Sequence, residues 1–268
     1  MDERQFNYLQ EMDIPLWVSR EEILRDEAHE PNSEIQHRVE AEVSQQIAEP
    51  SPPPVEIVAQ PQPQLEAAVI DEPQAAAIKS DDLSSLDWEA LQGEVSRCQN
   101  CSELVSHRSR TVFGVGDAQA DWLIIGEAPG AEEDRQGEPF VGPAGQLLNA
   151  MLQAIGLQRS QVYITNILKC RPPSNRDPKV DEIEQCCRYL QRQIALIQPK
   201  VILVVGRIAA QSLLQSSEPV GKLRGRVHQL ESGIPLIVTY HPAYLLRAPA
   251  EKAKAWHDLK LAHNVFNR

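Results

Sequence analysis

Five cysteines are spaced along the chain in a way that could bind metal. They form an early Cys-x-x-Cys pair, a single residue in mid-chain and a later adjacent pair: Cys98, Cys101, Cys170, Cys186 and Cys187. Residues 171–178 are rich in proline and turn residues, which favours a rigid loop able to hold thiolates. Structural zinc usually takes two close pairs, and the 15 residues between Cys170 and Cys186 favour a four-thiolate iron–sulfur cluster instead. Zinc and independent core thiols are the alternatives.

A second set of polar residues follows three apolar runs. The segment Gly126-Glu127-Ala128-Pro129-Gly130 comes at the end of the first run, Asn166 lies near the end of the second, and His241 follows the last. If these runs are parallel strands, their carboxyl ends meet at one edge of a sheet, where such sheets bind ligands. An amide can both donate and accept hydrogen bonds, and an imidazole can donate to developing negative charge. We therefore expect a polar ligand site at this edge.

The elements that must position these residues alternate along the chain. Four apolar runs predict buried strands, and four segments with a helical pattern separate or follow them. The strands are expected at 121–126, 162–167, 201–206 and 235–240, and the helices at 146–155, 178–197, 208–214 and 250–266. A strand at 226–230 could pair with the last strand through a turn at 231–233. This order predicts an α/β fold, a three-layer α/β/α sandwich with a mostly parallel four-stranded central sheet.

Charge and composition divide the chain near residue 80. Residues 1–80 hold 17 acidic against 5 basic residues, whereas the remainder holds 21 of each, so the net charge of −12 does not argue against nucleic acid binding by the C-terminal part. We expect a short interaction motif at 1–25, an acidic Pro/Gln/Glu-rich disordered linker at 26–85 and one folded domain at 86–268. Because no apolar run is long enough to cross a bilayer and the N-terminus has no signal pattern, we expect a cytoplasmic protein without membrane contact.

Five motifs, in order, resemble one enzyme family. They are Cys98-x2-Cys101, Gly126-Glu127-Ala128-Pro129-Gly130, Pro139-Phe140-Val141-Gly142, the stretch from Thr165 through Cys170-Arg171-Pro172-Pro173 to Pro178, and His241-Pro242-Ala243-Tyr244-Leu245-Leu246-Arg247. Together they resemble the family 4 uracil-DNA glycosylases, the iron–sulfur branch of their superfamily, over about residues 90–266. The resemblance implies a bacterial, nucleoid-associated, monomeric enzyme of base excision repair. Such an enzyme flips uracil out of DNA and removes it by hydrolysis, leaving an abasic site.

The resemblance also implies a 4Fe–4S cluster. Its four ligands fall on Cys98, Cys101, Cys170 and Cys186, and Cys187 is then a spare thiol in the core. An electron-transfer protein would fit the cysteines too, but it would leave His241 and the other motif residues without a role.

The remaining motifs imply a uracil pocket. His241 resembles the residue that donates a hydrogen bond to uracil O2 as negative charge develops there. Asn166 resembles the amide that recognises the edge of the base, and Phe140 resembles the ring on which the flipped base stacks. No lysine lies in these motifs except Lys169, beside a cluster ligand, so lyase chemistry through a Schiff base is not expected.

The attacking water needs an acidic side chain to position it. Some branches of the superfamily place an aspartate where this chain has Ala128. Ala128 has no carboxylate, so it is expected to line the uracil site but not to position the water. Glu127 and Glu133 are then the candidates for the water, and the choice between them stays open. Glu132 and Asp134 are expected to be solvated loop charges.

Contacts to DNA are expected around the same loops. Leu245 and Leu246 could wedge into the gap left by the flipped base. Phosphate contacts are expected from Arg171, Arg176 and Arg247, with Arg110, Arg224 and Arg226 as further candidates.

Residues 1–25 resemble a different protein. Phe6, Tyr8, Leu9, Ile14 and Trp17 loosely follow the N-terminal peptide of the psi subunit of the bacterial replicative clamp loader, which implies the clamp loader as a partner. The alternative function is accordingly a replication-associated interaction protein that has a glycosylase-like fold and little catalysis.

Overall fold

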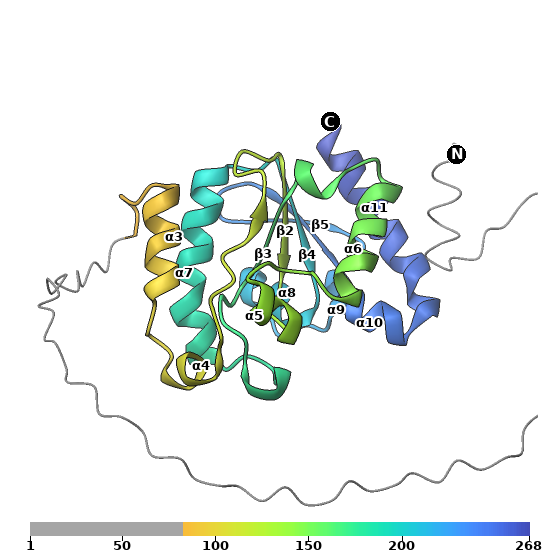
Figure 1. The fold of residues 1–268 in the computed structure, drawn as a ribbon. Coiled ribbons are helices and arrows are strands. Elements are labelled where there is room, and N and C mark those ends of the chain that lie inside the picture. The colour runs from red at the N-terminus through yellow and green to blue at the C-terminus, as the bar shows by residue number, and fades with distance from the viewer. Residues whose placement is uncertain (1–82) are drawn as a thin grey trace, which may run out of the picture. The chain divides into compact units, whose positions relative to one another are not determined.

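The computed structural model describes residues 83–268, which form a six-stranded sheet between layers of helices (Figure 1). The strand order is β1-β3-β2-β4-β6-β5. The inner four strands run parallel, whereas β1 and β5 pair antiparallel at the two edges. The strands are β1 Val115–Gly116, β2 Trp122–Gly126, β3 Tyr163–Asn166, β4 Val201–Val205, β5 Val227–Gln229 and β6 Pro235–Thr239.

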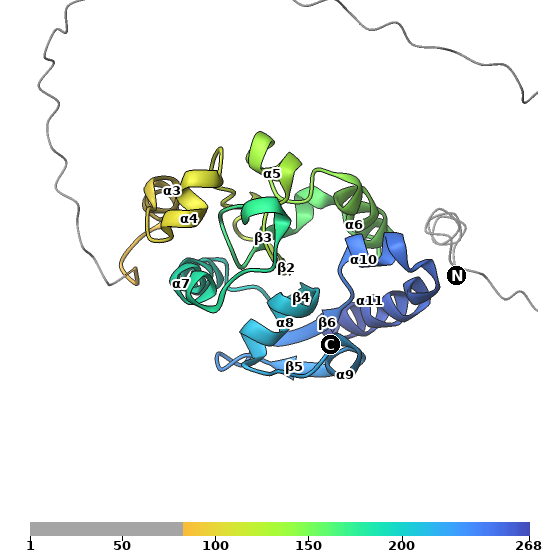
Figure 2. The same cartoon turned by 90° about the horizontal axis from the view of Figure 1, so that it is seen from below.

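Successive residues of the inner strands point to opposite faces of the sheet, so each strand contributes to two cores. Trp122 and Ile124 of β2 join the cluster under α6 (Pro143–Ala154) and α11 (Lys252–Phe266). Leu123 and Ile125 join the cluster under α7 (Val180–Ile197) and α8 (Arg207–Leu214). Figures 1 and 2 show α6 and α11 on one side of the sheet and α7 on the other. The three-layer α/β/α prediction is confirmed.

Shorter helices complete the fold. They are α3 Trp88–Arg97, α4 Ser102–His107, α5 Ala131–Gln136, α9 Val220–Leu223 and α10 Pro242–Arg247, with 3-10 turns at η1 Arg159–Gln161, η2 Pro173–Asn175 and η3 Pro249–Glu251. Helices α3 and α4 pack on α7 through a third apolar cluster that includes Leu91, Leu104 and Tyr189. The structure thereby brings the first cysteine pair, at the junction of α3 and α4, next to the later cysteines in and before α7.

The number of strands predicted from the sequence was too small. All four predicted strands are present, and the pairing expected for 226–230 occurs between β5 and β6, but the sheet has six strands rather than four. Strand β1, which was not predicted, is only two residues long and partly exposed, so no apolar run in the sequence indicates it.

Some predictions concern residues that the structure does not describe. The interaction motif at 1–25 and nearly all of the linker at 26–85 lie outside the described residues, and the boundary at residue 86 stays a prediction. Leu83, three residues before that boundary, is already buried in the third cluster. Within the described part, no helix combines the length and the apolar character that crossing a bilayer requires.

Candidate functional site

The carboxyl ends of the inner strands bring the predicted pocket residues together. Gly126 ends β2 and is paired with Asn166, the last residue of β3. His241 follows β6, whose Thr239 carbonyl accepts a hydrogen bond from the amide of Gly206 after β4. Figure 2 looks along the sheet at this edge, with α5 and α10 beside it. The convergence expected from the sequence is therefore present in the fold.

The centre of the site is a buried amide. Asn166 is 2% exposed, and its Oδ1 atom has no hydrogen-bond partner among the described residues. A Cβ atom on Gly126 would lie 2.7 Å from Cζ of Phe140 and closer still to Oδ1 of Asn166. Glycine is thus required where β2 ends, because only a residue without a side chain leaves room for the amide and the ring. An unsatisfied buried amide is costly, so this one is suited to a ligand that supplies the missing partner.

His241 packs against Phe140. The two rings are stacked with centroids 5.5 Å apart. His241 precedes α10 as its N-cap residue, and its Nδ1 atom accepts a hydrogen bond from the amide of Ala243 at 3.1 Å. Because a backbone N–H only donates, Nδ1 carries no proton and the neutral ring holds its hydrogen on Nε2. Burial, helped by the positive charge of Arg247, lowers the pKa of His241 to about 4, so the ring is a neutral donor at pH 7.

The loop that carries Phe140 is held in an unusual conformation. Phe140 has φ 54°, in the left-handed region that a non-glycine residue rarely adopts, and is 6% exposed. Its carbonyl lies so close to Gly145 that any Cβ there would collide with it. The preceding carbonyl, of Pro139, accepts a hydrogen bond from the guanidinium of the partly buried Arg159. Arg159 therefore supports the aromatic residue from behind, a role that the sequence did not reveal.

The two candidate acids differ in their surroundings. Glu127 is partly buried beside β2, and burial together with the negative charge of Asp177 raises its pKa, although Arg207 acts in the opposite direction. No hydrogen bond to the Glu127 carboxyl group exists within residues 83–268. Glu133, in contrast, accepts a hydrogen bond from the amide of Val141 at 3.2 Å, so one of its oxygens fixes the loop before α6.

The expectation for Asp134 was wrong. Glu132 pairs with Arg135 on the surface, as a solvated charge should. Asp134, however, is buried, and its carboxylate accepts hydrogen bonds from the amides of Ser109 and Arg110. These two amides lie about 25 residues earlier in the chain, so the carboxylate anchors the segment after α4 to α5.

The four expected cluster ligands line one small hollow between α3–α4 and α7, which we call the cysteine hollow. Its walls include Cys98, Cys101, Cys170 and Cys186, together with Leu104, Arg108 and Tyr189. The thiols carry polar partners: Arg108 Nη1 donates to Sγ of Cys170 at 2.9 Å, and the amide of Lys169 donates to Sγ of Cys186 at 3.2 Å. Cys187 lies elsewhere, in a groove between α7 and α8.

The chemistry of this donor set fits an iron–sulfur cluster. Burial, reinforced by the neighbouring thiols, raises the pKa of Cys101 to about 11, and burial raises that of Cys186 to about 12. Four thiolates in such a hollow need bound cations, and N–H donors to the sulfurs are typical of iron–sulfur sites. Among the described residues no group of three or more side chains is spaced to hold a single metal ion.

The structure separates the two leucines that were expected to contact DNA. Leu245 is 1% exposed and belongs to the core under α6 and α11, so it has no access to DNA. Leu246 is 45% exposed, next to the exposed Arg247 at the end of α10. The wedge hypothesis therefore applies to Leu246 alone. Ala128 is partly buried against the third apolar cluster.

Several arginines have structural partners. Arg176 forms a bidentate pair with Glu182 and a further ion pair with Glu103, which holds the loop after β3 against α4. Arg224 forms a bidentate pair with the buried Asp258 and is therefore not a free phosphate contact. Both arginines differ from the expectation of available surface charge.

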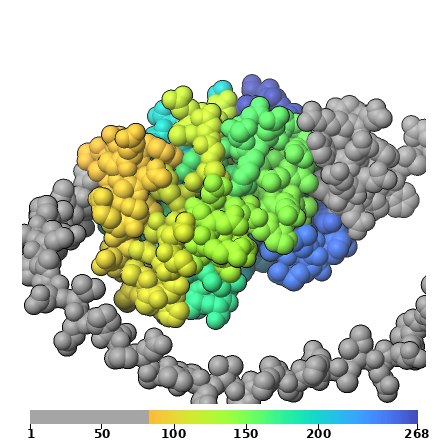
Figure 3. Space-filling model, viewed as in Figure 1, coloured from red at the N-terminus to blue at the C-terminus, as the bar shows by residue number. Residues whose placement is uncertain are grey.

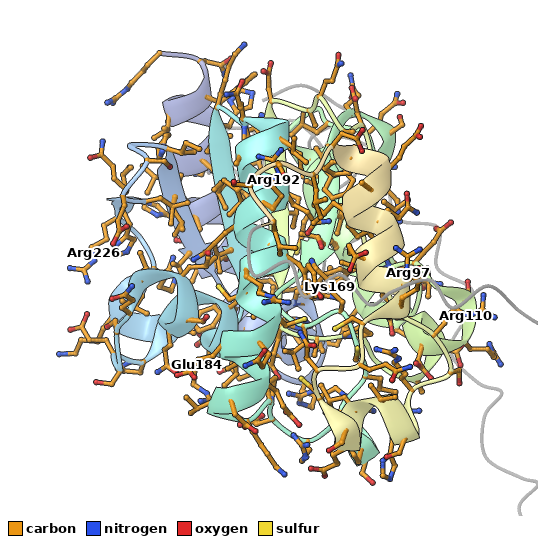
Figure 4. The ribbon with its side chains drawn as sticks, turned by 90° about the vertical axis from the view of Figure 1, so that its left-hand side faces the viewer. Arg97, Arg110, Lys169, Glu184, Arg192 and Arg226 are labelled. Atoms are coloured by element: carbon orange, nitrogen blue, oxygen red, sulfur yellow. The ribbon has the colours of Figure 1, made fainter. Side chains whose placement is uncertain are left out.

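The other arginines are spread over the domain. Arg171 donates a hydrogen bond to Asn175 within the loop after β3. Arg110 and Arg226 lie on opposite sides of the domain in Figure 4, so the expected arginines do not all belong to one surface. In Figure 3, α4, α5, the loop after β3 and α10 lie along the lower border of the domain.

Comparisons with known proteins agree with this site. Residues 113–260, more than half of the chain, match the model of the uracil DNA glycosylase superfamily. The chain belongs to the uracil-DNA glycosylase superfamily. The matched span begins at Phe113, just before β1, and ends within α11, so it contains the whole sheet and the pocket residues.

Relatives place the chain within the superfamily. A type-4 uracil-DNA glycosylase of Archaeoglobus fulgidus is 42% identical over 181 residues, which cover 64% of this chain and 91% of that protein. A type-4 enzyme of Thermotoga maritima is 39% identical over 160 residues, covering 59% of this chain and 83% of the relative. A type-5 uracil-DNA glycosylase of Thermus thermophilus is 30% identical over 193 residues, which cover 58% of this chain and 87% of that protein. The family 4 resemblance is confirmed.

Proposed function

We propose that this protein is a monofunctional uracil-DNA glycosylase that removes uracil from DNA by hydrolysis in base excision repair. The observation that carries the proposal is the buried, unpartnered amide of Asn166 beside the stacked rings of Phe140 and His241. The type-4 relatives at about 40% identity support the same activity. They disfavour the alternative of an interaction protein with little catalysis.

The first part of the reaction is recognition of the base. Uracil must leave the duplex to reach a buried site, and the exposed Leu246 would fill the gap that it leaves. The flipped ring would stack on Phe140, which requires some rearrangement of the Phe140–His241 stack. The Asn166 side chain can donate to one polar atom of the uracil edge and accept from another, so the base supplies the partner that Oδ1 lacks.

The second part is cleavage of the N-glycosidic bond. Its electrons leave with uracil, and negative charge develops on O2 while the sugar becomes cationic. His241 would donate its Nε2 hydrogen to O2 as this charge develops, and its low pKa keeps the ring neutral so that no proton need be transferred.

The third part is attack of water on the sugar cation. We assign the positioning of this water to Glu127 rather than Glu133. Burial raises the pKa of Glu127, as suits a group that accepts a proton near neutral pH, and its carboxylate is not engaged by a hydrogen bond within residues 83–268. Glu133 already supports the loop through Val141.

A 4Fe–4S cluster would be held by Cys98, Cys101, Cys170 and Cys186. Bound there, it would supply a structural link, joining the α3–α4 junction to α7 and to the loop after β3. Cys170 lies in that loop, four residues after Asn166, so the link would stabilise one wall of the pocket. No step of the base-removal chemistry requires the cluster.

The activity is tested under single-turnover conditions. The full-length protein is incubated in excess over labelled oligonucleotides that each carry one uracil, thymine or cytosine. Alkali then cleaves the strand at any abasic site. We expect cleavage only of the uracil strand, and only after alkali treatment because a monofunctional enzyme leaves the backbone intact. Cleavage of none of the three strands, or equal cleavage of all three, would reject the proposal.

We further propose the clamp loader as a partner of residues 1–25, which lie outside the described residues. The support is the sequence of this segment alone. Calorimetry of a 1–25 peptide with an assembled clamp loader should show binding that Trp17→Ala removes. An absence of binding would leave these residues without an assigned partner.

A further inference from the structure

Lys169 is a buried cation that the base-removal chemistry does not use. It is 1% exposed, and Figure 4 places it in the interior beside α7. Its ammonium donates three hydrogen bonds, to Oγ1 of Thr165 at 2.6 Å, to the carbonyl of Asn166 at 2.8 Å and to Oε1 of Gln193 at 2.7 Å. All three donors of the ammonium are therefore satisfied, and the acceptors are all uncharged.

The same residue is tied to the cysteine hollow. Its amide donates to Sγ of Cys186 at 3.2 Å, and the next residue in the chain is Cys170. The link between Lys169 and the cysteine hollow therefore runs through its backbone, whereas its ammonium bonds to Thr165, Asn166 and Gln193.

In the other direction, Lys169 holds the residue at the centre of the pocket. Its bond to the Asn166 carbonyl closes the turn that follows β3, while the amides of Ile167 and Leu168 donate to the Gly126 and Glu127 carbonyls. The network is anchored further by the carbonyl of Phe113, which accepts from both Thr165 and Gln193. The backbone around Asn166 is thus held by hydrogen bonds from Lys169, Ile167 and Leu168.

We propose that Lys169 is a positioning residue for uracil recognition, whose ammonium holds the backbone turn at Asn166 in place. The inference rests on the proposed function, in which Asn166 binds the uracil edge. Loss of the ammonium would let the turn relax and misalign the Asn166 amide. Misalignment should weaken binding of uracil specifically, because contacts to the DNA backbone lie elsewhere.

The test is a double-mutant cycle on binding rather than on turnover. The full-length iron-loaded protein is titrated with an oligonucleotide carrying 2′-fluoro-deoxyuridine, whose fluorine slows cleavage, and with the matching thymine strand. The measured quantity is the ratio of the two dissociation constants for the wild type, Lys169→Met, Asn166→Ala and the double variant. Iron content is recorded for each protein, which separates loss of the cluster from loss of recognition.

We expect Lys169→Met to reduce the preference for uracil by about tenfold, the scale of one well-placed hydrogen bond. In the Asn166→Ala background the same change should have almost no further effect, since coupled residues are non-additive. Lys169→Gln, which keeps an amide donor, should lose less, and it carries the same cycle if Lys169→Met does not fold.

Two results would overturn the inference. One is an unchanged uracil preference in both Lys169 variants, and the other is equal effects of the Lys169 change with and without Asn166. A wild-type protein that shows no preference for uracil would reject the proposed function instead, so the two failures are distinguishable.

Discussion

Cys186 and Cys187 are adjacent in α7 but face different parts of the molecule. Cys186 lines the cysteine hollow with Cys98, Cys101 and Cys170, whereas Cys187 lines the groove between α7 and α8. One step along a helix rotates the side chain by about 100°, which explains the separation. The two residues therefore form a matched pair for testing the cluster.

Cys186→Ala should lose the iron, and Cys187→Ala should keep it. We expect about four irons per chain in the wild type and in Cys187→Ala, measured with a colorimetric chelator together with visible absorbance. Zinc in place of iron after anaerobic purification would contradict the cluster, and the reverse order of the two variants would show that Cys187 is the ligand.

The two candidate acids should respond differently to neutralisation. Glu127→Gln removes the group assigned to the water and should slow single-turnover excision by about a hundredfold or more. Glu133→Gln keeps an oxygen that can accept from Val141, so its effect should be much smaller. Because the pKa of Glu127 is raised, activity should begin to fall at a higher pH than the one at which an ordinary glutamate becomes protonated. Equal rates in both variants would remove the assignment.

Asn166→Asp should damage recognition of uracil, because a carboxylate cannot donate a hydrogen bond as the amide does. The expected result is weaker binding and slower excision of uracil, with some activity gained on cytosine. Parallel rates on uracil and cytosine strands measure this change. Retention of full uracil excision would mean that another residue recognises the base.

The low pKa of His241 makes stability depend on pH. The folded state titrates at about 4, below the ordinary histidine value of about 6.5. Between these values the unfolded chain binds a proton that the folded protein does not, so the free energy of unfolding falls as pH decreases from about 6.5 to about 4. Urea denaturation of the wild type and His241→Gln should show a difference in stability that changes over this window. A constant difference would contradict a His241 ring that stays neutral in the folded protein over this window.

The sequence predicted the fold where the signal was local. Continuous apolar runs identified β2, β3, β4 and β6, whose residues are all buried except the partly buried Pro235 at the start of β6. The two-residue β1 has no such run. Helix α10 was missed although Pro242 at its first turn and the apolar Leu245 were available signals, and this omission led to the wrong expectation that Leu245 contacts DNA.

The parts of the site that directly follow strands were predictable from the sequence. The contacts between residues far apart in the sequence were not. Asn166 and His241 converge because parallel strands end at one edge. Burial of Asp134 depends on amides in a distant segment, and the pairing of Arg224 with Asp258 joins residues 34 positions apart. No spacing pattern in the sequence encodes such contacts. The support of Pro139 by Arg159 belongs to the same class.

The most direct test of the account is the single-turnover rate of uracil excision by His241→Ala compared with the wild type. His257→Ala serves as the control, because His257 is exposed on α11. We expect a decrease of about a hundredfold or more for His241→Ala, the scale of one lost donor to a developing oxyanion, and no change for His257→Ala. An unchanged rate for His241→Ala would contradict the proposed role of His241, because it would place the chemistry away from the carboxyl edge of the sheet.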